Sequence, residues 1–261
     1  MKKGKVWFVG AGPGDPELVT LKGRRLLDEA DVIVYAGSLV NPGLLRGVKA
    51  ELHDSAGMEL EEITNVLVKA ASGGKLAVRL HSGDISFYSA ISEQIDVLKK
   101  EGIAYEVVPG VSSLGAGAAA LGQELTIPEV SQSVIVTRMA GRTPVPELEG
   151  IRAFASHRST MVVFLSVGMM EKLTMELIDG GYPADTPVAV VEKASWPGQK
   201  ILRGRLRDIA EKVKQEGITK TALIYVGEAI GAPDGNMNKG KKSRLYDKDF
   251  SHGTRKKKER K

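Results

Sequence analysis

Short runs of β-branched and other apolar residues recur along the chain, separated by segments with the periodicity of an amphipathic helix. Several runs are apolar at consecutive positions, which is typical of strands that are covered on both faces. Strands that alternate with helices predict an α/β protein with mostly parallel sheets. We expect strands at residues 6–9, 32–35, 76–80, 105–108, 134–137, 161–165, 188–191 and 222–226.

The helical patterns also indicate how the chain divides into domains. Residues 60–71 and 91–100 carry apolar side chains at helical spacing, and Gly102 is a plausible stop for the second helix. The alternation pauses at the small-residue segment 115–124, which fits a helix packed tightly against a sheet. We therefore predict an N-terminal α/β domain over residues 1–120, a C-terminal α/β domain over 121–235, and a basic tail over 236–261.

The composition excludes several classes of active site. The 261 residues include no cysteine, so disulfides, thiolate nucleophiles and cysteine-ligated metal centres are excluded. The four histidines show no metal-ligand spacing, and we expect no metal. No run approaches the ~18 consecutive apolar residues of a membrane helix. We expect a cytoplasmic protein without membrane contact.

The net charge of +5 is confined to the C-terminal end. Residues 239–261 hold 11 Lys or Arg and 3 Asp or Glu, which leaves 26 basic and 29 acidic residues in the remainder. The body of the protein is therefore slightly acidic. A lysine-rich tail is usually solvated chain and only sometimes a polyanion-binding arm, so we expect no nucleic-acid partner.

The first predicted strand leads into the glycine loop GAGPGDP, residues 10–16. A dinucleotide-binding turn is the obvious alternative, but its last glycine position is occupied by Asp15. Pro13 also removes a backbone N–H from a loop that would have to donate such groups to a pyrophosphate. The next strand ends in Ala36 and Gly37, with no acidic residue for a ribose hydroxyl. We therefore disfavour an NAD or FAD site.

A tight turn that binds nothing would explain the glycine loop alone. However, unusual loops follow three other strands: RLHSGD at 79–84, VPGVSS at 108–113 and EKASWP at 192–197. Ligands of open α/β sheets bind outside the carboxyl ends of the strands, where these loops are expected. Four such loops favour a cleft shared by both domains.

These loops and their strands resemble the tetrapyrrole (corrin and porphyrin) methylase family. The similar segments follow in order: VGAGPGDPELVTLKG, ADVIVYAGSLV, RLHSGD, VPGVSS and VAVVEKASWPGQKI. Three more, YAGSLVNP, LTIP and TRMAGRTPVPE, resemble the branch that methylates C11 of precorrin-4, as do SRLYD and FSHG in the tail. The resemblance covers about residues 4–255.

The resemblance implies two α/β domains with S-adenosylmethionine held in a cleft between them and S-adenosylhomocysteine as the product. It also implies a homodimeric C-methyltransferase that acts at C11 of precorrin-4, or of its cobalt complex, in cobalamin biosynthesis. The cofactor contacts that it implies are Pro13, Ser82, Gly83, Asp84, Phe87, Ser112, Ser113, Leu165, Ala194, Thr221 and Ala222. The candidate contacts to the substrate, a macrocycle with several carboxylates, are Gly12, Asp15, Arg79, His81, Arg138, Arg142, Lys193 and Trp196.

The chemistry of these residues agrees with that assignment, but each has a simpler explanation. Asp84 can favour the cationic end of the cofactor, yet it can also cap a helix that begins near Ser86. The serines at 112–113 offer hydroxyls, and they can equally cap the helix that follows them. Phe87 and Leu165 suit an adenine, although such residues more often belong to a core. The arginines suit carboxylates, although each can be a surface ion pair instead.

The sequence departs from the family pattern at three positions. Ile85 replaces a proline, Ser89 replaces a glycine, and Gly37 stands where an acidic residue is common. Because the last of these removes a possible general base, we assign no catalytic residue. Methyl transfer to carbon needs alignment of donor and acceptor above all, so such a site remains consistent with an enzyme.

Other functions remain open at this stage. The same fold can methylate another tetrapyrrole or RNA, and an RNA substrate would make binding strongly salt-dependent. A tetrapyrrole-binding protein without catalytic activity would not require S-adenosylmethionine at all.

Overall fold

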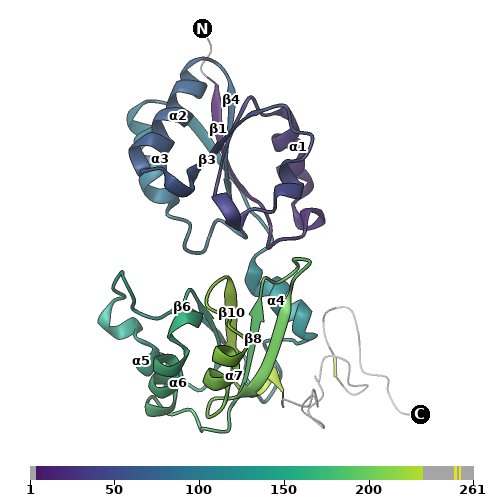
Figure 1. Ribbon diagram of the computed structural model, residues 1–261, viewed down its shortest axis with the longest axis vertical. Coiled ribbons are helices and arrows are strands. Elements are labelled where there is room, and N and C mark those ends of the chain that lie inside the picture. Colours follow the sequence, from purple (N-terminus) through teal and green to yellow (C-terminus); the bar gives the residue numbers. More distant parts are fainter. Residues whose placement is uncertain (1–3, 232–249, 252, 254–261) are drawn as a thin grey trace, which may run out of the picture. The chain divides into compact units, whose positions relative to one another are not determined.

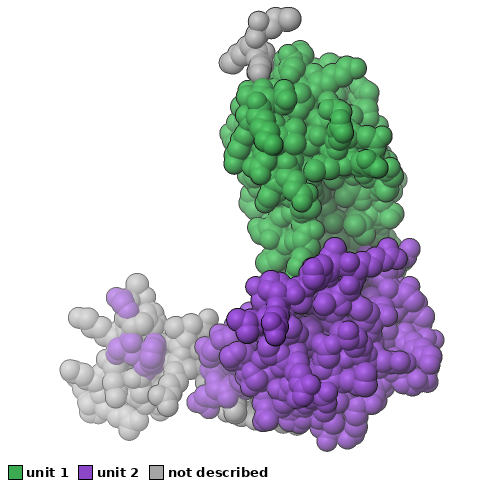
Figure 2. Space-filling model, turned by 90° about the vertical axis from the view of Figure 1, so that its left-hand side faces the viewer, with its two compact units in different colours: residues 1–117, 193–200 green, residues 118–192, 201–261 purple. Residues whose placement is uncertain are grey.

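The computed structural model describes residues 4–231 together with residues 250, 251 and 253. Nearly all of the predicted basic tail, including its SRLYD element, lies outside these residues. The chain divides into two compact units, coloured separately in Figure 2: unit 1 comprises residues 1–117 and 193–200, and unit 2 comprises residues 118–192 and 201–261. The first division point falls within helix α4 (Ser113–Leu121), as does the boundary expected after residue 120. The inclusion of residues 193–200 in unit 1 is not apparent from the sequence.

Unit 1 is built on a five-stranded sheet with strand order β3-β2-β4-β1-β5, in which every neighbouring pair is parallel. Parallel neighbours need crossover connections, which the helices of this unit provide (Figure 1). Its strands are β1 (Lys5–Gly10), β2 (Val32–Tyr35), β3 (Glu51–Asp54), β4 (Leu76–His81) and β5 (Ala104–Val108). Its helices are α1 (Leu21–Glu29), α2 (Leu60–Ser72) and α3 (Ile91–Lys100).

The sheet of unit 1 is buried on both faces, which explains its consecutive apolar residues. Val32 and Val34 pack into a core on the side of α2 and α3, whereas Ile33 between them packs into a second core on the side of α1. Figure 1 shows these helices on opposite sides of the sheet. The strand period of two therefore sends alternate side chains into two different cores.

Unit 2 contains a second five-stranded sheet, with strand order β6-β7-β10-β8-β9. Strands β6 and β7 are parallel, but β10 is antiparallel to both of its neighbours, β7 and β8. The strands are β6 (Val134–Arg138), β7 (Thr160–Phe164), β8 (Pro187–Glu192), β9 (Lys200–Arg205) and β10 (Ala222–Val226). The helices α5 (Ile151–Ala155), α6 (Met170–Asp179) and α7 (Ile209–Gln215) pack on one core against this sheet.

The predicted α/β class and all eight predicted strands are confirmed, as are the helices at 60–71 and 91–100. Two expectations were wrong. The sheet of unit 2 is mixed rather than mostly parallel. Strands β3 and β9 were also missed. Both lie at sheet edges, and neither has a run of consecutive buried apolar residues. Among the described residues, no helix has the length and apolar character needed to cross a bilayer.

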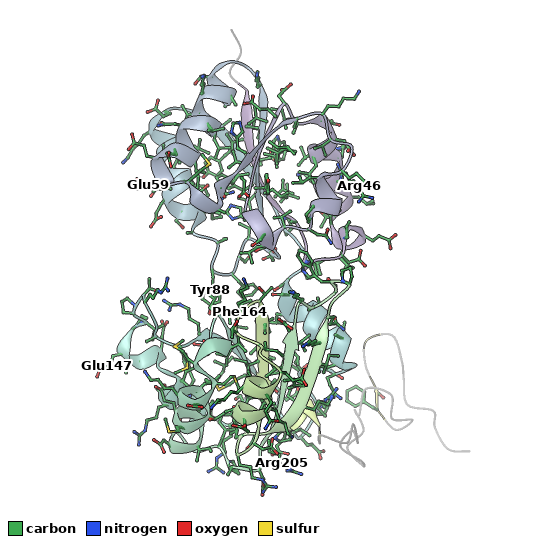
Figure 3. All side chains as sticks on the ribbon, viewed as in Figure 1. Arg46, Glu59, Tyr88, Glu147, Phe164 and Arg205 are labelled. Carbon is green, nitrogen blue, oxygen red and sulfur yellow. The ribbon has the colours of Figure 1, made fainter. Side chains whose placement is uncertain are left out.

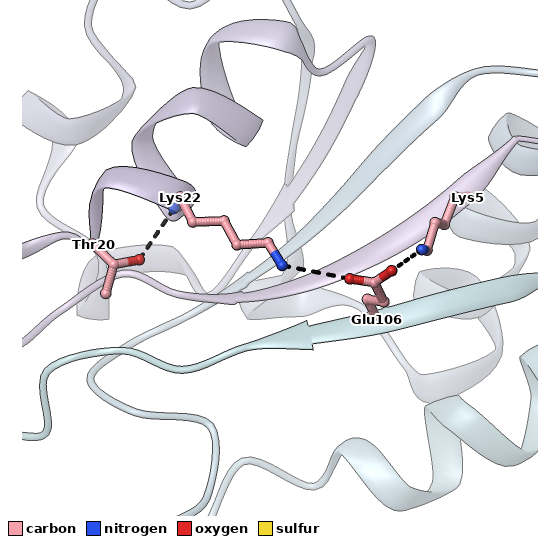
Figure 4. Close-up of polar contacts among 5 residues, drawn as sticks. Lys5, Thr20, Lys22 and Glu106 are labelled. Carbon is pink, nitrogen blue, oxygen red and sulfur yellow. Dashed lines mark hydrogen bonds and ion pairs between the residues drawn. The ribbon is translucent and has the colours of Figure 1, made fainter.

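A polar cluster joins α1 to the β5 edge of the unit 1 sheet (Figure 4). Thr20 caps α1 by accepting a hydrogen bond from the amide of Gly23 at 3.1 Å. Glu106 on β5 pairs with Lys5 and, at 3.5 Å, with Lys22 of α1. The ion pairs with these lysines lower the pKa of Glu106, although the group is solvent-exposed. Exposed pairs of this kind contribute little to stability.

Candidate functional site

The loops that follow β1 and β4 are joined by backbone hydrogen bonds in unit 1. Gly12 donates to the carbonyl of Gly83 at 3.2 Å, and Gly83 donates back to Gly12 at 2.8 Å. Ala11 donates to the carbonyl of His81 at 2.7 Å. The predicted residues Gly12, Pro13, Ser82 and Gly83 therefore lie in one structure at the carboxyl edge of the sheet.

The loop that follows β5 packs against the end of β1 at two glycines, Gly110 and Gly10. A Cβ atom on Gly10 would lie within 3.0 Å of the Cα and N atoms of Gly110, which leaves no room for a side chain. Gly83 contributes to this crowding, since its carbonyl oxygen faces the same two positions. Gly10 and Gly110 are thus explained by close backbone approach.

Asp84 holds two of these loops together. One carboxylate oxygen accepts from the amide of Ser86 at 2.9 Å, and the other accepts from the amide of Gly110 at 2.8 Å. Desolvation raises the pKa of Asp84, but the opposing hydrogen bonds from Ser86, Gly110 and Ile85 outweigh it, so the net pKa is lowered. The site therefore contains a carboxylate that stays negatively charged. The alternative in which Asp84 caps a helix was wrong, because residues 85–88 form a turn and α3 begins only at Ile91.

The serine pair lies at the start of α4. Ser112 accepts a hydrogen bond from the amide of Leu114 at 3.2 Å, and Ser113 is the first residue of the helix. The capping explanation is confirmed for Ser112. Capping does not exclude a ligand contact, since the Ser112 hydroxyl can still donate a hydrogen bond.

Residues 85–90, which follow Asp84, form a strained loop with exposed aromatic side chains. Tyr88 (Figure 3) and Ala90 adopt positive φ angles of 54° and 49°. Phe87 and Tyr88 are 37% and 46% exposed, so the alternative that Phe87 belongs to the core was wrong. Positive φ at residues with side chains is unfavourable and tends to occur at functional loops.

The segment 193–200 of unit 1 lies against the glycine loop. The Trp196 indole Nε1 donates to the carbonyl of Pro13 at 2.9 Å, and the amide of Asp15 donates to the Ser195 hydroxyl at 3.0 Å. Ala194 is buried, whereas Lys193 is exposed with a φ of 49°. The predicted domain boundary places this segment in the C-terminal domain, whereas in the structure it belongs to unit 1, with the glycine loop.

Arg79 and His81, two of the predicted substrate contacts, are buried inside unit 1. The Arg79 guanidinium donates to Gln94 at 3.2 Å, to the Val34 carbonyl at 3.2 Å and to the Ser55 hydroxyl at 3.1 Å. His81 stacks on Phe8, and its buried Nε2 has no hydrogen-bond partner among the residues that the structure describes. Burial lowers the pKa of Arg79 to about 10; burial, followed by the charge of Arg79, lowers the pKa of His81 to about 3. His81 is therefore neutral, and Arg79 binds protein groups.

The remaining predicted residues gather at one end of the unit 2 sheet. The antiparallel register, with Val163 opposite Ile224, brings the end of β7 beside the start of β10. Leu165 therefore lies at the same end of the sheet as Thr221 and Ala222. Leu165 and Thr221 have positive φ angles of 53° and 54°, and Leu165 is 70% exposed, which rules out a core position for it.

Arg138, the last residue of β6, organises the loop that follows it. Its guanidinium donates to the carbonyls of Met139 and Thr143, both at 3.2 Å, and to Pro144 at 2.7 Å. Arg142 lies on this loop and is exposed. Arg138 itself is half-buried.

Two polar contacts of the site were not predicted. Asn41 donates from its side-chain amide to the carbonyl of Gly14 at 2.8 Å, and Ser195 bonds Asp15 as described above. Both residues stand inside motifs that the sequence brings out, the Asn-Pro pair at 41–42 and EKASWP, which were the available signals. Within the residues that the structure describes, no group of three or more His, Asp or Glu side chains could hold a metal ion.

Comparison with known proteins identifies the family. The family of tetrapyrrole (corrin/porphyrin) methylases matches residues 5–210. A protein of Methanocaldococcus jannaschii named cobalt-precorrin-4 C(11)-methyltransferase is 59% identical over 254 residues, covering 97% of this chain and 96% of its own.

Solved structures agree with this result. The X-ray structure of a cobalt precorrin-4 methyltransferase of cobalamin biosynthesis superposes with a TM-score of 0.85 at 47% identity, covering 87% of this chain and 96% of that one. A uroporphyrin-III C-methyltransferase from Thermus thermophilus, complexed with S-adenosylhomocysteine, gives a TM-score of 0.74 at 34% identity, covering 87% and 93%. The chain belongs to the tetrapyrrole (corrin/porphyrin) methylase family.

Proposed function

We propose that this protein transfers a methyl group from S-adenosylmethionine to C11 of cobalt-precorrin-4 in cobalamin biosynthesis. The observation that carries the proposal is the 59% identity to a cobalt-precorrin-4 C(11)-methyltransferase over 97% of the chain. The structural similarity to a cobalt precorrin-4 methyltransferase also supports it. Both names specify the cobalt complex, which favours that substrate over metal-free precorrin-4.

The residues of unit 1 suit the proposed cofactor. S-adenosylmethionine is a cationic sulfonium compound with polar and aromatic parts, and it supplies the methyl group and the leaving group when bound. Asp84 stays ionised and offers a negative charge to that cation. Backbone groups of the packed loops and the hydroxyls of Ser112 and Ser113 offer hydrogen bonds. The proposed contacts from this unit are Pro13, Ser82, Gly83, Asp84, Phe87, Ser112, Ser113 and Ala194.

The contacts proposed from unit 2 are fewer. Leu165 offers an exposed apolar surface for the adenine, and Thr221 and Ala222 stand at the same end of the sheet. The positive φ angles of Leu165 and Thr221 are the kind of strain that tends to accumulate at ligand sites.

For the substrate carboxylates we propose the two exposed cations near these loops, Arg142 and Lys193. Gly12 and Asp15, which lie in the glycine loop, are proposed as further substrate contacts. The buried Arg79 and the loop-forming Arg138 are proposed to shape the site rather than to bind the macrocycle. Neutral His81 is proposed to support the strand from which the Ser82–Asp84 loop emerges.

These residues act by position. No acid or base is assigned, because displacement at the methyl carbon needs a donor and an acceptor in line and free of competing water. Protein loops locked by hydrogen bonds, such as those at Gly12, Gly83 and Gly110, meet that demand better than free loops do. The homodimer and the cytoplasmic location implied by the family resemblance belong to the same proposal.

The first test measures binding of S-adenosylhomocysteine by calorimetry, on protein freed of carried-over cofactor, with NAD as a control. We expect micromolar binding of S-adenosylhomocysteine and no response to NAD. If the folded protein does not bind S-adenosylhomocysteine, this result would contradict the methyltransferase proposal and favour the function of a tetrapyrrole-binding protein.

The second test follows transfer of a labelled methyl group from S-adenosylmethionine to three acceptors: cobalt-precorrin-4, precorrin-4 and uroporphyrinogen III. We expect the highest kcat/KM for cobalt-precorrin-4, with the label at C11. A preference for uroporphyrinogen III would overturn the assigned substrate, and the Thermus thermophilus relative makes it the natural competitor to include.

A further inference from the structure

The turn between β8 and β9 is unusual because residues 193–200 belong to unit 1, whereas β8 and all of β9 after Lys200 belong to unit 2. The turn is held in shape by its own hydrogen bonds. Ser195 donates from its amide to the Gln199 side chain at 2.8 Å, and Trp196 donates from its amide to the Lys193 carbonyl at 3.0 Å. Positive φ angles at Lys193 (49°) and Ser195 (66°) indicate a conformation that the surrounding contacts must maintain.

This turn contacts three consecutive residues of the glycine loop. Trp196 bonds the carbonyl of Pro13, and Ser195 bonds the amide of Asp15. Between them, the indole ring covers Gly14 so closely that a Cβ atom there would lie within 3.0 Å of its Cγ, Cδ1 and Nε1 atoms. Asn41 holds the carbonyl of Gly14 with a hydrogen bond of its own.

Gly14 is required by the indole and not by its own backbone. Its φ is not among the positive values found at glycines such as Gly12, so an alanine would fit the backbone conformation. The side chain of Trp196 alone supplies the three atoms nearest to the added methyl group. Residues 14 and 196 are therefore a matched pair: a glycine keeps space free that the tryptophan fills.

We infer that Trp196 is a positioning residue, which clasps the glycine loop and fixes the Pro13 peptide in the geometry that the cofactor site needs. The inference rests on the proposed function, because it assumes that this loop contributes to the cofactor site. A loop with glycines at 10, 12 and 14 has unusual conformational freedom, so a side chain that restrains it removes an ordering cost from ligand binding. In this role Trp196 prepares the glycine loop for ligand binding.

A double-mutant cycle on S-adenosylhomocysteine affinity tests the inference. Gly14→Ala alone should weaken binding roughly ten-fold, because the new methyl group displaces the indole. Trp196→Ala should weaken it by a similar factor. In the Trp196→Ala background, Gly14→Ala should add less than about two-fold, because nothing is left to displace. Independent effects that multiply, or a Trp196→Ala variant with wild-type affinity, would overturn the clasp.

Two further variants keep the test interpretable. Trp196→Phe keeps an aromatic ring and loses only the Nε1 donor, so we expect about five-fold weaker binding, the equivalent of one net hydrogen bond. Trp7→Phe is the matched control. Trp7 is the second of the two tryptophans in the chain, and its ring makes cation–π contacts with Lys5 and Lys22. It should bind as the wild type does.

Fluorescence separates failure of the clasp from failure of the proposed function. In the Trp7→Phe background Trp196 is the one tryptophan left of the two in the chain. Gly14→Ala should then shift its emission to longer wavelength and increase its quenching by acrylamide, with no ligand present. If wild-type protein binds no S-adenosylhomocysteine while this shift occurs, the proposed function fails and the clasp stands. If the emission is unchanged, the clasp is refuted whatever the ligand does.

Discussion

The carboxylate of Asp84 and the backbone amide of Gly110 form a hydrogen bond of 2.8 Å that joins the loop after β4 to the loop after β5. The second oxygen of the same carboxylate accepts a hydrogen bond from the amide of Ser86 at 2.9 Å, so both carboxylate oxygens have a backbone donor. One residue thus sets the spacing of two loops and also supplies the negative charge of the proposed cofactor site.

Replacing Asp84 by asparagine is expected to weaken S-adenosylhomocysteine binding at least ten-fold. The amide can accept only through its single oxygen, so either Ser86 or Gly110 loses its acceptor, and the charge is lost as well. Charge-assisted bonds of this kind contribute about 1.5–3 kcal/mol. Calorimetry on Asp84→Asn and on the control Asp96→Asn, an exposed residue of α3, measures the effect. Equal affinities in the two variants would contradict the assigned role.

Gly10→Ala is expected to destabilise unit 1 by about 2–3 kcal/mol, because the added Cβ would overlap backbone atoms of Gly110 that cannot move aside easily. Gly57→Ala is the control, since a Cβ there would meet no atom within 4 Å. Both tryptophans lie in unit 1, so urea unfolding followed by tryptophan fluorescence reports on this unit. A Gly10→Ala variant as stable as Gly57→Ala would refute the close approach of the two loops.

Arg79→Lys should cost about 2 kcal/mol of stability although it conserves the charge. A lysine ammonium cannot reach Gln94, the Val34 carbonyl and Ser55 with the planar geometry of a guanidinium, so buried acceptors lose their donors. Arg25→Lys, at an exposed position of α1, should change stability by less than about 0.5 kcal/mol. The same urea titration compares the two, and an equally small effect at both sites would contradict the network.

Stability should fall as the pH is lowered from about 7 towards 5, and part of this loss should depend on His81. Its pKa is lowered from 6.5 to about 3 in the folded protein, so within that interval the unfolded chain binds a proton that the folded chain does not. Linkage then favours unfolding as the pH falls, by about 2 kcal/mol between pH 7 and pH 5. His81→Phe should remove this contribution, whereas His157→Gln, at an exposed site, should not. Identical pH profiles for wild type and His81→Phe would refute it.

The sequence by itself determined the repeating strand–helix order and the places where ligand-binding loops follow strands. Both are local properties: strands buried on two faces need consecutive apolar residues, and glycines mark backbone that must turn sharply or approach another chain segment closely. The motifs around Gly12, Asp84, Ser112 and Trp196 could therefore be picked out, and the family resemblance followed from their order.

Only the tertiary structure decided what depends on partners distant in sequence. Edge strands such as β3 form because a neighbouring strand offers hydrogen bonds, and the apolar pattern of the sequence does not predict this pairing. Arg79 has the sequence context of a ligand contact, yet three acceptors from separate segments draw it into the interior. Trp196 and Gly14 are 182 positions apart, yet residue 14 must be a glycine because the Trp196 indole occupies the space of a side chain there. Such pairs arise from packing, which is a property of the folded chain and not of any local stretch of it.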